Sequence, residues 1–255
     1  MSASQGWVGL VGDYLLDPRS WTEPGGLGER LVEHVWLSGL SVALAVLLTV
    51  PVALLLGHAG RGGGLAVVLG NLGRAVPVLA LIALLFLLPA PLGPRDASVV
   101  VALTLFAVPP LLTNTYVGVR QVDRGVVEAA RGMGMSAAQV LLRVELPLAL
   151  PLVLTGLRLA ALQTVATASV AGMVAGPGLG RIVTEGFTTD APSRYVGAAL
   201  VIAALALAVE GLLVLLQRAA DRVGRARRRG PGGGAADDGE DLQDAGVASL
   251  GFTTS

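Results

Sequence analysis

Apolar residues fall into five long blocks along the chain, separated by shorter polar segments. The blocks cover residues 35–57, 65–89, 97–119, 148–175 and 195–216, and each is more than twenty residues long. A helix of about 20 residues crosses a hydrocarbon core of roughly 30 Å. A membrane β-barrel needs short segments of alternating hydrophobicity instead, and the sequence shows none. The pattern therefore predicts an all-α fold, a polytopic membrane helix bundle with about five core transmembrane helices.

The blocks are interrupted by small residues and prolines. Each contains Gly, Pro, Ser or Thr beside Leu and Val, which suits helices that pack closely within a bundle. Pro51, Pro77 and the pair Pro109-Pro110 are expected to kink their helices or to end one early, because proline lacks the backbone N–H. Such breaks are tolerated where neighbouring protein or water satisfies the freed carbonyls.

The segments outside the blocks divide the chain into three parts. Residues 1–33 form an N-terminal outer or interfacial segment, in which Trp7–Leu16 is predicted to be an interfacial helix because indoles favour that depth. This segment lacks the basic start and small-residue end of a signal peptide. Residues 34–220 form the transmembrane domain. Residues 221–255 form a basic, then acidic and Gly-rich tail, too polar to bury a core and expected to be disordered.

Arginine placement predicts the orientation, since cytoplasmic loops carry an excess of basic residues. With the N-terminus outside and the C-terminus cytoplasmic, eleven arginines lie on the inner side and five on the outer side. The inner set is Arg61, Arg120, Arg124, Arg131, Arg143, Arg218, Arg222, Arg225, Arg227, Arg228 and Arg229, and the outer set is Arg19, Arg30, Arg95, Arg181 and Arg194. A multi-pass protein of a bacterial cytoplasmic membrane is the expected class.

Only 14% of the residues are charged, and mean hydropathy is +0.72. Three ionisable residues, Arg74, Arg158 and Glu210, fall within the blocks, where charges are costly and are usually paired or face water. The favoured interpretation is an internal ion pair between Glu210 and either Arg74 or Arg158. The alternative is a charge on a polar translocation path.

Residue types that would indicate catalysis or cofactor binding are largely absent. The chain has no Cys and no Lys, so thiolate metal sites and the usual phosphate loop are excluded. His34 and His58 are interpreted as headgroup-level polar residues at helix ends. The glycines of AGPGLGR at 175–181 are interpreted as a tight outer turn and not as a phosphate cradle, because no strand precedes them. We therefore expect a non-catalytic chain that holds no cofactor or metal and binds no nucleic acid.

One connection between two blocks is long and structured, VEAARGMGMSAAQVLLRVELPLALP at 127–151. Residues 126–131 predict a helix with Glu128 near its start, where a carboxylate complements the helix dipole. Gly132 and Gly134 then predict a turn. Ser136 and Gln139 form the capping-box pattern of a new helix, 137–146, which Pro147 is expected to stop. Small Ala129 and Ala130 are expected to leave a helix surface that a partner can approach closely.

This connection resembles the EAA signature of bacterial ABC importer permeases of the MetI-like superfamily. Glu128-Ala129-Ala130 precedes Gly134 at the family's interval, and nine residues then lead to Val144-Glu145-Leu146-Pro147. Val144 replaces the usual Ile. Within residues 31–187, further stretches resemble the osmoprotectant branch, which carries glycine betaine, carnitine and choline. They are EHVWLS at 33–38, NLGRAVPVLAL at 71–81, NTYVGV at 114–119 and AGPGLGRIVTEGF at 175–187.

The resemblance implies partners and a mechanism. Two permease subunits, the same chain or a sister chain, form a pathway through the bilayer, and an extracytoplasmic binding protein delivers the solute. Two ATPase subunits bind ATP and Mg²⁺ and dock on the connection at about 120–147, which supplies cytoplasmic coupling helices. The ATPase-coupling residues would be Glu128, Ala129, Ala130, Gly134, Leu146 and Pro147. Asn114 and Tyr116 are candidates for lining the pathway.

Alternatives remain open from the sequence alone. Pro177 stands where the branch has a small residue and Arg74 where it has a neutral polar one, and both departures concern the solute. Because importers of different solutes share the docking loop, the solute could instead be methionine or another small polar compound. An ion-driven secondary transporter would require paired half-sequence repeats, which are not evident. A non-transporting membrane scaffold would not need the full EAA pattern.

Overall fold

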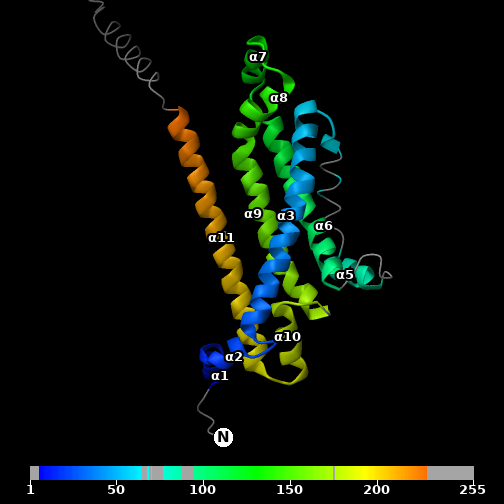
Figure 1. The fold of residues 1–255 in the computed structure, drawn as a ribbon, viewed down its shortest axis with the longest axis vertical. Coiled ribbons are helices and arrows are strands. Elements are labelled where there is room, and N and C mark those ends of the chain that lie inside the picture. The colour runs from blue at the N-terminus through cyan, green and yellow to red at the C-terminus, as the bar shows by residue number, and fades with distance from the viewer. Residues whose placement is uncertain are drawn as a thin grey trace, which may run out of the picture. The chain divides into compact units, whose positions relative to one another are not determined.

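The computed structural model describes residues 6–64, 68, 70, 77–87, 95–174 and 176–228, and every regular element among them is a helix (Figure 1). The chain forms two compact units, Met1–Leu215 and Leu216–Ser255. Helix α11 crosses the boundary between them, and the first unit contains the other helices. The long helices are α3 Leu27–Ala59, α6 Arg95–Arg120, α9 Leu146–Val174 and α11 Pro192–Arg228. The short ones are α1 Trp7–Leu16, α2 Pro18–Thr22, α5 Val78–Leu87, α7 Arg124–Gly132, α8 Ala137–Val140, a π-helical turn Leu141–Glu145, and α10 Leu179–Thr188.

Four of the predicted membrane blocks are long apolar helices. Within the described residues, the segments Leu27–Ala59, Ala97–Arg120, Ala137–Val174 and Pro192–Ala219 are long and apolar enough to span a bilayer. The prediction of a polytopic all-α bundle is therefore confirmed. The second predicted block, 65–89, is described chiefly as α5, and its remainder, with Arg74, lies outside the described residues.

The core of the first unit forms where α3, α6 and α9 pack against one another (Figure 1). Ala45, Ala107 and Ala160 are completely buried at this contact, so the helix backbones approach closely. A Cβ added at Gly156 of α9 would lie 2.8 Å from the Cβ of Asn114 in α6. Small residues therefore determine the spacing of these helices, as is usual in membrane bundles.

The interior prolines do not end their helices. Pro51 lies within α3, and Pro109 and Pro110 lie within α6, so of the two predicted effects, a kink or an early end, the early end does not occur at these prolines. At the second site, the side-chain Nδ2 of Asn114 donates a hydrogen bond to the Pro110 carbonyl at 2.8 Å. Pro77 directly precedes α5. Its missing N–H costs no hydrogen bond there, because the first N–H groups of a helix have no partner within the helix.

The N-terminal helices pack against α10 and the beginnings of α3 and α11. Helix α1 has the predicted bounds, Trp7–Leu16. Leu27, Leu179, Ile182 and Ala198 form the buried cluster that joins these elements. Trp21 donates its indole N–H to the carbonyl of Leu15 at 2.9 Å, within the N-terminal segment itself. Helix α11 continues past residue 220 to Arg228, and the rest of the predicted tail lies outside the described residues.

Candidate functional site

The predicted structured connection is formed by α7, α8 and the π-helical turn, at the end of α3 and α9 away from α10 (Figure 1). Helix α7 begins at Arg124, earlier than predicted, because Asp123 caps it by accepting a hydrogen bond from Gly125 N at 2.7 Å. Glu128 therefore lies in the middle of α7. The role at the helix dipole that was expected for Glu128 belongs to Asp123.

The glycine turn after α7 has the bond pattern of a Schellman motif. Gly134 has φ 84°, its N–H donates to Arg131 O at 2.9 Å, and Met135 N donates to Ala130 O at 3.2 Å. Met135 also packs on the apolar cluster that contains Ala130, which is the contact that usually accompanies this motif. The predicted turn is therefore present, and its left-handed residue is Gly134.

The capping box is also present, but the helix after it continues further than expected. Ser136 Oγ accepts from Gln139 N at 3.3 Å, and Gln139 Oε1 accepts from Ser136 N at 2.8 Å. Pro147 does not stop the helix, since residues 137–174 form one helical segment. Leu146 N bonds to Leu141 O within the wider π-helical turn just before the proline. We attribute the continuity to this turn, because a regular α-turn would press the proline ring against the carbonyl four residues earlier.

Helix α7 has one buried face and one exposed apolar face. Val127 and Ala130 are buried and pack with Val122 and Val140. Val126, Ala129 and Met133 share the outer face at helical spacing, and the side chains of Val126 and Met133 are 45% and 77% exposed. We call these three residues the α7 stripe. The predicted surface of small residues on α7 therefore includes Ala129 but not Ala130, because Ala130 faces inward.

The other predicted coupling residues occupy both sides of this segment. Glu128 and Gly134 are exposed. Leu146 packs inward against a cluster that includes Leu54 and Val119, whereas Pro147 is exposed. The structure thus brings the signature residues into one segment, with some facing outward and others anchoring the segment to the bundle.

A buried hydrogen bond that was not predicted from the sequence joins this segment to α3. His58 Nδ1 lies 2.6 Å from Glu145 Oε2, and Glu145 is 1% exposed. The signal was present in the sequence, because Glu145 is an isolated carboxylate in an apolar run, but it was interpreted only as part of the VELP match. His34 also departs from the headgroup-level interpretation, since it is buried and its Nε2 lies 3.0 Å from Val165 O.

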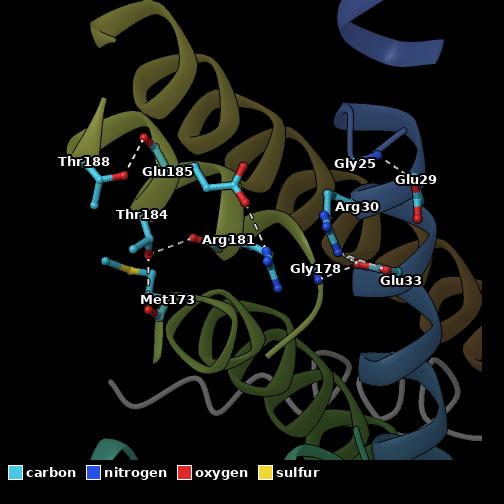
Figure 2. Close-up of polar contacts among 11 residues, drawn as sticks. Gly25, Glu29, Arg30, Glu33, Met173, Gly178, Arg181, Thr184, Glu185 and Thr188 are labelled. Atoms are coloured by element: carbon cyan, nitrogen blue, oxygen red, sulfur yellow. Dashed lines mark hydrogen bonds and ion pairs between the residues drawn. The ribbon is translucent and has the colours of Figure 1, made fainter. Parts of the chain in front are cut away.

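Polar contacts also join the beginning of α3 to α10 (Figure 2). Glu33 accepts a hydrogen bond from Gly178 N at 2.8 Å and forms an ion pair with Arg30 at the same distance. Gly178 has φ 100° and is the N-cap of α10, so the turn predicted for AGPGLGR is confirmed. The amide that a phosphate cradle would need already binds the Glu33 carboxylate.

The structure describes two of the three charged residues that lie within the predicted spans. Arg158 Nε of α9 lies 3.2 Å from Glu210 Oε1 of α11, which confirms one of the two predicted pairings. Arg74 lies outside the described residues. Of the candidate pathway residues, Asn114 bonds to the Pro110 carbonyl and Tyr116 packs on Ala53 and Leu112. Both side chains therefore make contacts within the protomer.

Comparison with known proteins places this arrangement among transport proteins. Residues 45–222 match the family described as "Binding-protein-dependent transport system inner membrane component". The choline transport system permease protein OpuBB of Bacillus subtilis (strain 168) is 32% identical over 197 residues, covering 77% of this chain and 89% of that protein. The osmoprotectant import permease protein OsmY of Salmonella typhimurium is 34% identical over 195 residues, covering 75% and 80%.

Solved structures share the fold. An inward-facing structure of the MetNI methionine ABC transporter matches 82% of this chain and 98% of the compared chain, with a TM-score of 0.65 and 22% identity. At this identity the likeness concerns the fold alone. The matched family covers three of the four apolar helices almost entirely, together with the α7–α8 segment. The chain is therefore a multi-pass membrane protein that belongs to the family of binding-protein-dependent transport system inner membrane components, the permease subunits of ABC importers.

Proposed function

We propose that this chain moves quaternary-amine osmoprotectants across the membrane, driven by ATPase subunits that dock on α7. The observation that carries the docking is the α7 stripe, an exposed apolar face on a helix that is capped at Asp123 and ended by the Gly134 turn. A rigid amphipathic helix of this kind fits an apolar groove on a partner. ATP and Mg²⁺ bind to that partner, and this chain holds neither.

The energetics of coupling require more than binding. A docked ATPase shifts the permease between two states only if it contacts α7 differently in each of them. The inner face of α7 packs on Val140, directly before the π-helical turn and α9. A displacement of α7 is therefore passed to a helix that spans the bilayer.

We assign the α7 end to the cytoplasm and the α10 end to the outside, where a solute-binding protein delivers its cargo. The arginine distribution supports this orientation. A second permease subunit, a copy or a sister chain, completes the pathway. Exposed leucines of α11 such as Leu200, Leu207 and Leu212 offer an apolar face for that subunit or for lipid.

The proposed solutes are glycine betaine, choline and carnitine. Support comes from relatives whose names refer to choline and to osmoprotectants and whose match covers most of this chain. Methionine or another small polar solute is the alternative. An ion-driven mechanism is a further alternative, in which uptake would not depend on ATP.

Capture of the ATPase tests the docking. Detergent-solubilised permease with Glu128→Arg or Gly134→Asp is expected to lose a co-expressed ATPase in an affinity pull-down while remaining in the membrane. Glu23→Ala, at an exposed carboxylate near the opposite end, is the matched control and is expected to retain it. Unchanged capture, or undiminished ATP-dependent uptake in Gly134→Asp, would contradict the docking role.

Uptake assays test the solute and the orientation. Proteoliposomes with the full complex and its binding protein are supplied with labelled glycine betaine, choline, carnitine or methionine, with and without ATP inside. We expect ATP-dependent uptake of the quaternary amines, and uptake of methionine alone would replace that assignment. Because the chain has no cysteine, single variants Leu16→Cys and Met133→Cys report orientation with an impermeant thiol reagent. Labelling of Met133→Cys in intact cells would reverse the assigned orientation.

A further inference from the structure

Glu145 is a charged residue in an unusual position. It ends the π-helical turn Leu141–Glu145, and its residue surface is 1% exposed. Burial of a carboxylate is strongly unfavourable unless the group is paired and hydrogen-bonded. His58 provides that pairing, with 2.6 Å between its Nδ1 and Glu145 Oε2. The burial and the short distance together make this contact specific in position.

The histidine side of the pair is held rigidly. His58 lies in the last turn of α3, which ends at Ala59 with Gly60 in the left-handed region at φ 68°. A side chain there that donates or carries positive charge also interacts favourably with the helix C-terminus. The preceding Gly57 lies so close to α6 that an added Cβ would be 2.8 Å from the Cβ of Val119. The end of α3 is therefore packed closely against α6, so a displacement of His58 requires a displacement of α3.

The glutamate side belongs to the coupling segment. Residues 137–174 form one helical segment, so Glu145 lies between the capped start of α8 and the spanning helix α9. The turn that contains it has the π-helical pattern, in which Leu146 N bonds to Leu141 O. Such turns are commonly found at functional sites in helices. A displacement of α7 and α8 therefore reaches Glu145 directly.

The far end of α3 has its own polar contact. Glu33, near the beginning of α3, accepts from Gly178 N at the start of α10 (Figure 2). Helix α3 has 33 residues, about 50 Å at a rise of 1.5 Å per residue. One helix thus carries a buried polar contact to the α7–α8 segment at one end and a polar contact to the α10 segment at the other.

We propose that His58 and Glu145 are positioning residues that link the ATPase-docking segment to α3, so that α3 carries its displacement to α10. This inference rests on the proposed docking of an ATPase on α7. Displacement of α7 moves Glu145, its hydrogen bond to His58 draws the end of α3 with it, and Glu33 transmits the shift to the N-cap of α10. An apolar contact at the same place can slide, whereas a short hydrogen bond is directional and keeps its register.

The test removes the link without leaving a buried charge. In His58→Leu/Glu145→Leu, both partners become apolar, a replacement that is often neutral for stability. We expect this variant to capture the ATPase normally but to transport about 5- to 150-fold less solute per ATP hydrolysed, the usual range of coupling between sites. Glu145→Gln keeps an oxygen that accepts from His58 and is expected to retain coupling. Arg181→Ala/Glu185→Ala removes an exposed ion pair within α10 and is the matched control.

A distance measurement separates this role from simple packing. Spin labels at Leu87→Cys in α5 and Thr188→Cys in α10, both exposed, report movement of α10 relative to α5 in the assembled complex, because α5 packs on α6 and α9 and is not part of the α10 cluster. The ATP-dependent change in this distance is expected in the parent and absent in the Leu/Leu variant. Its persistence with normal transport would overturn the inference, as would failure of the Leu/Leu variant to assemble, which would indicate a packing role. If Glu128→Arg leaves ATPase capture intact, the docking proposal itself fails and this inference fails with it.

Discussion

The Oε2 atom of Glu33 accepts a hydrogen bond from the backbone N–H of Gly178 at 2.8 Å, across 145 residues of sequence. The contact places a carboxylate at the positive end of α10, where it satisfies an amide that has no partner within the helix. Arg30 forms an ion pair with the same carboxylate. The beginning of α10 is thereby tied to α3.

Replacing Glu33 is expected to loosen α10. Glu33→Ala removes the acceptor at the helix start and should cost about 1 kcal/mol, typical for loss of a cap. Amide hydrogen exchange in residues 180–186 of the purified permease should rise about fivefold. Glu29→Ala is the control, because Glu29 caps the Gly25 amide at the start of α3 instead. Equal exchange in the two variants would remove the role assigned to Glu33.

Gly180 is expected to tolerate no side chain. A Cβ built there overlaps the carbonyl oxygen of Ser169 in α9, so α9 and α10 would have to separate. Gly180→Ala should therefore lower the free energy of unfolding by about 1–3 kcal/mol or more, as overpacking does. The thermal midpoint of the detergent-solubilised protein measures this. Gly39→Ala, where an added Cβ meets nothing within 4 Å, should leave the midpoint nearly unchanged.

The pair between Arg158 and Glu210 is expected to show rescue by charge exchange. Either single change to Ala leaves an unpaired charge within the apolar helices, at a cost of up to about 3 kcal/mol. The monodisperse fraction in size-exclusion chromatography should fall in both and recover in Arg158→Glu/Glu210→Arg. The exposed Arg181 pairs with Glu185 one turn away, so Arg181→Ala should change stability by less than about 0.5 kcal/mol. No recovery in the exchanged variant would contradict a direct stabilising pair.

The capping box at Ser136 offers a local test. Ser136→Ala removes the acceptor for Gln139 N and should destabilise α8 by about 1 kcal/mol. Exchange at residues 138–140 should accelerate, while α7 exchange stays the same because Asp123 caps α7 separately. Ser136→Asp retains an acceptor and is the matched control. Equal acceleration in both variants would contradict the capping role.

Local signals predicted the elements of this protein well. Within the described residues, four of the five blocks of more than twenty apolar residues are helices long enough to span a bilayer, because the bilayer itself favours such a block as a helix. The capping box and the left-handed Gly134 likewise depend on residues within one turn, so sequence spacing was enough to find them. The signature at Glu128–Gly134 predicted the family for the same reason, since its positions are local.

Predictions failed where the outcome depends on the conformation or packing of neighbouring turns and not on the residue type alone. Pro147 was expected to end a helix, yet the π-helical turn before it lets the helix continue. Ala130 was expected on an outer surface and is buried instead, because Val122 and Val140 cover that face. A wider turn decided the first outcome and helix packing decided the second, and neither can be read from the residue type alone.

The sequence by itself therefore determined that the chain spans a membrane, where its structured connection lies and to which family it belongs. Only the tertiary structure decided that His58 meets Glu145, 87 residues away, and that Glu33 meets Gly178. The physical reason is the separation along the chain over which each interaction acts. Hydrophobic transfer and helix capping act within a single segment, whereas a polar contact between helices exists only after helix packing has brought two distant groups to hydrogen-bond distance.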